Sequence, residues 1–161
     1  MIINKYPKSG SMRYLAILSL VIVSMFILVG CSVKLIADYD EIIDKSTTEL
    51  QSKIETFLIK MGRVAGTSEG EYANNTAFYD EIKGVLISMR VRAKVIPKNN
   101  LMVEHIDLLE KNFELLRQLH EKQGKKGLTK VLIDPARNAL NAQFTAIAEL
   151  LGALRRGRTK I

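Results

Sequence analysis

The sequence contains little of several residue types, and each scarcity excludes a class of structure. Cys31 is the only cysteine among 161 residues, so no disulfide can form within the chain. The chain has no tryptophan and three prolines. It shows no long alternation of apolar and polar residues and no Asn-Gly or Asp-Gly turn, which are the usual signals of β-hairpins. The composition therefore favours an all-α protein.

Histidine is also scarce, which limits cofactor chemistry. A di-iron site between helices needs Glu-x-x-His pairs, but Met102 and Arg117 stand three residues before His105 and His120. Covalent haem needs Cys-x-x-Cys-His, and zinc needs three or four ligands. We therefore expect no metal, no cofactor and no enzymatic activity. We expect His105 at the edge of the fold, and His120 near a helix C-terminus, where it interacts with the helix dipole.

The first part of the chain has the layout of a secretory signal. Residues 14–33 carry no charge, and Lys5, Lys8 and Arg13 precede them without an acidic residue. Translation from Met12 instead of Met1 would give a shorter signal of the same kind. The uncharged span is also close to the length of about 20 residues that crosses a bilayer, so an uncleaved anchor is the alternative. In both cases the basic residues keep the N-terminus inside and place the rest outside.

The apolar run ends in Leu28-Val29-Gly30-Cys31. This tetrapeptide resembles the lipobox of bacterial lipoproteins, which has Leu, a small or β-branched residue, Gly or Ala, and then Cys. The resemblance implies that residues 1–30 are a signal peptide, cleaved between Gly30 and Cys31. It also implies that Cys31 is diacylated on sulfur and that its new N-terminus is acylated, for example with palmitate. Ser32 follows, and in diderm bacteria the resemblance then implies the outer membrane.

The rest of the chain, residues 31–161, is long enough for one small domain. Removal of residues 1–30 takes away three basic residues and no acidic one, so the formal net charge falls from +7 to +4. The exported part is therefore less basic than the whole chain. We expect it to face the periplasm as a single domain, without nucleic acid as a partner.

Apolar residues in steps of three and four predict the first two helices. The first spans residues 34–64. A capping-box spacing at Ser68-Glu69-Gly70-Glu71 and the stop signal of Pro97 predict a second helix from there to Val95. The seam of the first helix consists of Ile43, Thr47, Leu50, Ile54, Phe57, Met61 and Val64. The core positions of the second are Tyr72, Phe78 or Tyr79, Ile82, Val85, Met89 and Ile96.

Two further helices are predicted after Pro97. The third spans residues 101–123, with Asn99 or Asn100 as its cap. Asp134-Pro135 is a start signal for the fourth, which ends near Arg156, and residues 128–133 form either a separate turn or an early start. The third helix has a broad apolar face of Leu101, Ile106, Leu108, Leu109, Phe113, Leu115, Leu116 and Leu119. The fourth has Leu140, Phe144, Ile147, Leu151 and Leu154.

Four amphipathic segments with short connections predict an antiparallel four-helix bundle, preceded by a hydrophobic signal or anchor helix. Basic residues lie near the ends of the second, third and fourth helices. If the second and fourth run in the same direction, their basic ends gather at one end of the bundle and could contact an anionic surface. The alternative is ordinary placement near helix C-termini. The residues of the last group are Arg155, Arg156, Arg158 and Lys160.

The sequence predicts a non-enzymatic, lipid-anchored envelope protein that binds or scaffolds a partner. The membrane is contacted through lipidated Cys31, and the partner is either another envelope protein or a second copy that meets the seam of the first helix. The alternative is an uncleaved single-span protein that acts as a sensor or as an accessory subunit of a membrane complex.

Overall fold

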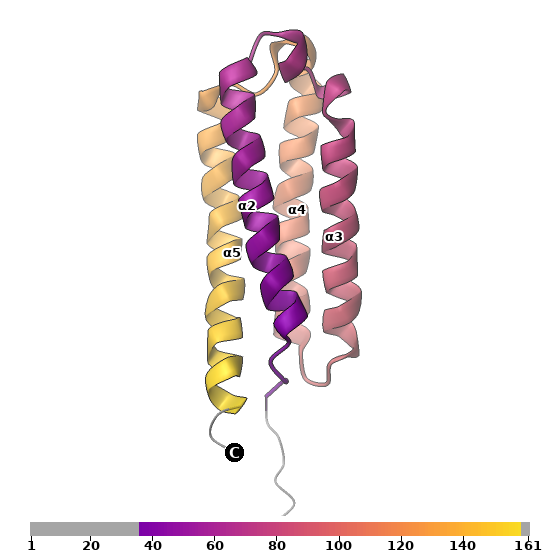
Figure 1. The fold of residues 1–161 in the computed structure, drawn as a ribbon, viewed down its shortest axis with the longest axis vertical. Coiled ribbons are helices and arrows are strands. Elements are labelled where there is room, and N and C mark those ends of the chain that lie inside the picture. Colours follow the sequence, from indigo (N-terminus) through magenta and orange to yellow (C-terminus); the bar gives the residue numbers. More distant parts are fainter. Residues whose placement is uncertain (1–35, 159–161) are drawn as a thin grey trace, which may run out of the picture. The chain divides into compact units, whose positions relative to one another are not determined.

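The computed structural model describes residues 36–158, and these form four long helices (Figure 1). They are α2 (Glu41–Val64), α3 (Thr76–Val95), α4 (Asn100–Gln123) and α5 (Lys130–Arg158), with three short 3₁₀ turns, η1 (Ser68–Gly70), η2 (Tyr72–Asn74) and η3 (Gly124–Lys126). No strand occurs within residues 36–158, so the all-α prediction is confirmed. No helix in this range is both long and apolar enough to cross a bilayer. The predicted signal peptide and the tetrapeptide that resembles a lipobox lie outside the described residues.

Helix α2 begins later than predicted, at Glu41 instead of Lys34. The backbone N–H of Ile43 donates to the Asp40 carboxylate at 2.9 Å, which satisfies one of the free donors at the helix N-terminus. The predicted seam is confirmed in all but its last position, since Val64 is only half-buried, and Leu58 joins it. These side chains pack inside the described fold, so the seam is not a surface for a second copy.

The predicted start of the second helix is wrong. Ser68 opens the turn η1 without capping a helix, and α3 begins only at Thr76. The reason is close packing around Gly70, where a Cβ atom would lie 2.3 Å from the carbonyl oxygen of Val64. The amide of Asn75 holds the loop by donating to the carbonyls of Glu69 and Glu71, each at 2.8 Å. The predicted stop at Pro97 is confirmed, since α3 ends at Val95.

Asn99 occupies the predicted N-cap position of α4, but its side chain does not cap α4. It is buried, and its amide donates to the carbonyl of Ala93 at the end of α3, at 3.2 Å. Three of the eight predicted apolar positions of α4 are wrong, because Leu101, Leu108 and Leu115 are exposed. The residues of α4 that are buried are Met102, Ile106, Leu109, Phe113, Leu116 and His120.

Helix α5 takes the early start that the sequence left open, at Lys130, and Pro135 lies inside it. Leu128 and Ile133 are almost fully buried, and this burial holds the first turn in place although proline removes one backbone donor. Thr129 supplies a carbonyl that accepts from the N–H groups of Leu132 and Ile133, both at 3.0 Å. The predicted core positions further along α5 are all buried.

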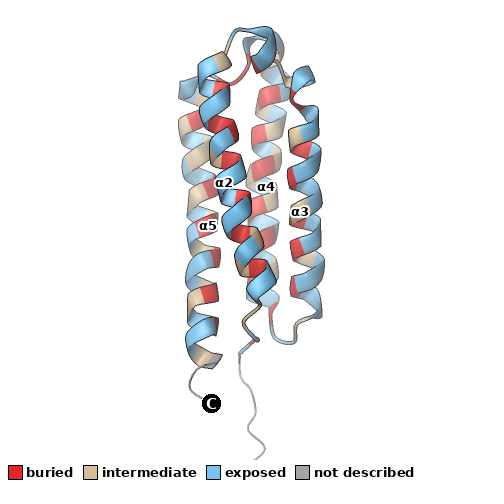
Figure 2. Cartoon of the chain, in the orientation of Figure 1, coloured by how far each residue is buried: buried red, intermediate tan, exposed pale blue. Residues whose placement is uncertain are grey.

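Helix α2 packs against α3 and α5, and α4 packs against the same two helices. Buried residues recur along all four helices, so the core extends over their length (Figure 2). The start of α2 lies beside the ends of α3 and α5, because Arg92 bonds Asp40 and Arg155 bonds Asp44. We call this the entry end, and the opposite end, with η1, η2 and η3, the distal end.

Candidate functional site

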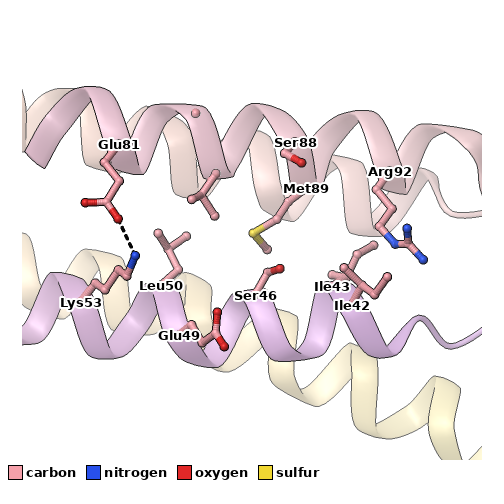
Figure 3. A pocket seen from close by; sticks show the side chains of 12 residues that line it. Ile42, Ile43, Ser46, Glu49, Leu50, Lys53, Glu81, Ser88, Met89 and Arg92 are labelled. Atoms are coloured by element: carbon pink, nitrogen blue, oxygen red, sulfur yellow. Dashed lines mark hydrogen bonds and ion pairs between the residues drawn. The ribbon is translucent and has the colours of Figure 1, made fainter. Parts of the chain in front are cut away.

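A groove of about 400 Å³ lies between α2 and α3 (Figure 3). Its apolar lining includes Leu50 and Met89, and the small side chains of Ser46 and Ser88 also line it. Gly84 also lines it, and a Cβ atom there would meet no atom within 4 Å. The small residues at these three positions therefore help to keep the groove open.

Charged pairs stand near both ends of this groove. The Lys53 ammonium bonds the Glu81 carboxylate across it, and the Arg92 guanidinium bonds Asp40 at 2.8 Å. Burial raises the pKa of Asp40, but the bonds from Arg92 and from the Ile43 N–H outweigh this and leave it below its ordinary value. No histidine or cysteine lines the groove, and residues 36–158 hold no group of three or more potential metal ligands. The geometry suits apolar contact and not acid–base chemistry.

His120 is the most deeply buried polar side chain of the described fold, which the sequence did not predict. Its Nδ1 lies 2.8 Å from the hydroxyl of Tyr79, and its Nε2 lies 2.8 Å from the carbonyl oxygen of Gly70. Because a carbonyl only accepts, Nε2 carries the proton and Nδ1 accepts from Tyr79. Burial lowers the pKa of His120, although the bond to Gly70 opposes the shift. His120 lies in the last turn of α4, as expected, but its buried ring bonds Tyr79 and Gly70.

The neighbours of His120 are aromatic. Phe57 stacks on Phe78 with ring centroids 3.7 Å apart, and Tyr79 meets His120 edge to face at 5.8 Å. Tyr72 accepts a hydrogen bond from Arg117 at 2.8 Å on the outer side of the cluster. Burial raises the pKa of the Tyr79 hydroxyl far above its ordinary value, so it remains a proton donor. These contacts hold α2, α3, α4 and the distal loops together.

His105, the other histidine, lies in the second turn of α4 and is half-buried. Its Nδ1 is buried and has no hydrogen-bond partner within the described part of the chain. One isolated imidazole nitrogen, without a second ligand beside it, supplies no catalytic or metal site.

The last predicted group of basic residues begins at the entry end, where its first member is paired with an acidic residue. Arg155 donates to the Tyr39 hydroxyl at 2.7 Å and also bonds Asp44, while Arg156 is exposed in the same turn of α5. A Cβ atom on Gly157 would lie 2.9 Å from Ile36, which places the end of α5 beside the chain entry. Lys160 lies outside the described residues, and of Arg158 only its place in α5 is described.

A second apolar surface lies on α4, at the leucines that the sequence placed in the core. Leu101, Leu108 and Leu115 are spaced by seven residues and are all exposed. Leu115 also borders a hollow of about 260 Å³ between α4 and α5, next to Leu119 and Ala136. Seven-residue spacing puts the three leucines in one row that a helix of another molecule can follow.

No protein-family model, curated protein or solved structure matches this chain. The function therefore has to be inferred from the chain's own residues. Two features of the chain bear on function: the tetrapeptide at residues 28–31 that resembles a lipobox, and the surfaces that the four helices leave exposed.

Proposed function

We propose that this chain is a lipid-anchored, non-enzymatic envelope protein whose antiparallel four-helix bundle binds or scaffolds a partner. The observation that carries the proposal is the tetrapeptide Leu28-Val29-Gly30-Cys31 at the end of an uncharged run. After cleavage before Cys31, acyl chains on this residue hold the protein on the membrane, and the bundle faces the periplasm. Ser32 favours the outer membrane.

The position of the entry end supports an anchor at Cys31. The described fold starts at Ile36, only five residues later. Five residues span at most about 18 Å, so an acylated Cys31 keeps the entry end close to the membrane surface. The buried apolar residues of all four helices form one shared core.

Contacts between helix ends support the antiparallel arrangement. At the entry end, Arg92 of α3 bonds Asp40 before α2. At the distal end, the N–H of Gly66 after α2 donates to the carbonyl of Lys126 before α5, at 3.0 Å. Both contacts support α2 running opposite to α3 and to α5, and the short connections favour the same reversal at α4.

The row Leu101, Leu108 and Leu115 is the surface for the proposed binding role. Leucines on a stable helix lose little freedom when a second helix covers them, which favours association. A photo-crosslinking side chain at Leu108 should therefore capture an envelope protein in intact cells. The same group at Lys83, which is exposed on α3, is the matched control.

The decisive experiment is the intact mass of the membrane-purified protein beside a Cys31→Ala variant. We expect a mass of residues 31–161 plus acyl chains, and no acylated species from the variant. A full-length, unacylated mass would overturn the lipid anchor and favour the uncleaved membrane span. Labelling with radioactive palmitate should agree with the mass.

A further inference from the structure

The turn between α3 and α4 has a composition unlike the rest of the entry end. Residues 94–101 contain Lys94, Val95, Pro97, Lys98 and Leu101 on the outside and no acidic residue. Val95 is 76% exposed and Leu101 is 52% exposed. Large apolar side chains between lysines are typical of segments that lie in the interface of a bilayer.

The turn presents these side chains from a fixed backbone. Ile96 is half-buried and packs against the core, and buried Asn99 ties the turn to α3 through the Ala93 carbonyl. Lys98 has a φ of +62°, in the left-handed region that residues with a Cβ atom avoid. Val95, Pro97 and Lys98 are thereby exposed together in this turn, which Figure 1 shows at the same end of the bundle as the start of α2.

The turn also lies at the end where the chain enters. Arg92, one turn before it, bonds Asp40, and exposed Ile36 precedes Asp40 on the same end. A membrane that holds Cys31 is therefore within reach of the turn. Each lysine close to an anionic bilayer adds attraction, and each apolar side chain in the interface adds more.

We propose that residues 94–101 form a tip that inserts Val95, Pro97 and Leu101 into the interface of an anionic lipid bilayer, with Lys94 and Lys98 on the headgroups. This deepens the proposed function and rests on its lipid anchor for the orientation of the fold. The tip and the acyl chains then hold the bundle at two points, which fixes its orientation on the membrane.

The distal end offers a matched control. Val131 is 80% exposed, with Lys125, Lys126 and Lys130 near it in the sequence. Its composition is similar, but α4 separates the two ends by 24 residues, or about 36 Å at 1.5 Å per residue. A bundle anchored through Cys31 holds Val131 away from the membrane.

The absence of tryptophan makes a clean optical test possible. We would place the full chain with Val95→Trp, Leu101→Trp or Val131→Trp in vesicles of phosphatidylglycerol and phosphatidylethanolamine with brominated acyl chains. We expect quenching of the tryptophan at 95 and at 101, and none at 131. Absence of quenching at both tip positions, or equal quenching at 131, would overturn the proposal, and the tip would then be a surface for a protein partner.

The charged part of the proposal has its own test. Lys94→Gln with Lys98→Gln in the Val95→Trp background should weaken the tip–bilayer equilibrium by roughly thirtyfold on anionic vesicles. On zwitterionic vesicles, the Val95→Trp protein with both lysines intact should show a similar loss of binding. Quenching that neither the lysine substitutions nor the zwitterionic lipid changes would overturn the role of the lysines. Intact mass of each preparation separates the two proposals. Acylated protein with an unquenched tip refutes the tip alone, and unacylated protein with a quenched tip refutes the anchor alone.

Discussion

The hydroxyl of Tyr79 on α3 donates to Nδ1 of His120 on α4, and the two atoms are 2.8 Å apart in the core. The same imidazole donates from Nε2 to the carbonyl of Gly70, in the loop between α2 and α3. The side chains of Tyr79 and His120 are both almost fully buried. One neutral side chain therefore joins three segments that are far apart in the sequence, and it does so where water cannot replace a lost partner.

The first prediction concerns this bond. Tyr79→Phe keeps the ring but leaves Nδ1 of His120 buried without a donor, and an unpaired buried group costs about 1–3 kcal/mol. We expect the free energy of unfolding to fall by that amount in urea denaturation, with the helical circular dichroism signal unchanged. Tyr72→Phe is the control, because Tyr72 is half-buried and water can solvate Arg117 in its place. Equal losses from the two variants would contradict the buried bond.

The second prediction is a dependence of stability on pH. Burial lowers the pKa of His120 in the folded state, whereas the unfolded chain has the ordinary value of about 6.5. Between these two pKa values the unfolded state binds the extra proton. The contribution of His120 to the free energy of unfolding is therefore fully present above about pH 6.5. It decreases as the pH falls below this value, and it stops decreasing below the folded pKa of His120. The slope cannot exceed about 1.4 kcal/mol per pH unit for one group.

Urea denaturation between pH 7.5 and pH 5 measures this dependence. The window stays above the ordinary pKa of carboxyl groups, so Asp40 and Glu114, whose pKa values are lowered, do not contribute there. His120→Gln should reduce the slope, because a glutamine can donate to Gly70 but does not titrate. An unchanged slope in this variant would assign the pH dependence to another group.

Much of the fold is readable from the sequence because local patterns dictate it. The steps from Ile43 to Met61 and from Leu140 to Leu154 predicted two core faces, and both are buried. Pro97 predicted the end of α3, since the residue before a proline avoids the helical region. These features depend on a few neighbouring residues and on a single periodicity.

The failures come from contacts between distant segments. Helix α4 offers two apolar rows, and only the partner helices decide that Met102 and Leu109 go inside while Leu101 and Leu108 stay outside. The position of His120 had a usable signal, since it continues the row of Phe113 and Leu116 in steps of three and four. The capping box failed because Gly70 packs against the end of α2. No pattern within residues 68–71 reports that contact.

The third prediction is a gain in stability at the groove. Gly84 lies within α3 and is exposed, and a methyl group added to its Cα atom would meet no atom within 4 Å. Gly84→Ala should therefore raise the free energy of unfolding by about 0.5–1 kcal/mol, because alanine loses less backbone freedom in a helix. Thermal or urea denaturation of the variant beside the unmodified protein measures this gain. A loss of stability would mean that the groove between α2 and α3 is closed in solution.

The fourth prediction compares two glycines at the distal end. Gly66 has a φ of +81° with open space around it, so Gly66→Ala should cost about 1–2 kcal/mol from backbone strain alone. Gly127 has φ +64° and ψ −170°, a conformation almost exclusive to glycine, and a Cβ atom there would lie 2.5 Å from the carbonyl oxygen of Gly70.

Gly127→Ala should therefore cost clearly more, about 3 kcal/mol or above, because the strain adds to a clash that neither backbone can avoid. The clash also displaces the carbonyl that accepts from His120, and because that bond opposes the lowering of the His120 pKa by burial, its loss should extend the pH dependence of stability to lower pH. Equal losses for Gly66→Ala and Gly127→Ala, with an unchanged pH dependence, would show that the loop at Gly70 shifts without disturbing His120. Combining Gly127→Ala with Tyr79→Phe then tests the link directly: a total loss smaller than the sum means that both substitutions act on the same imidazole.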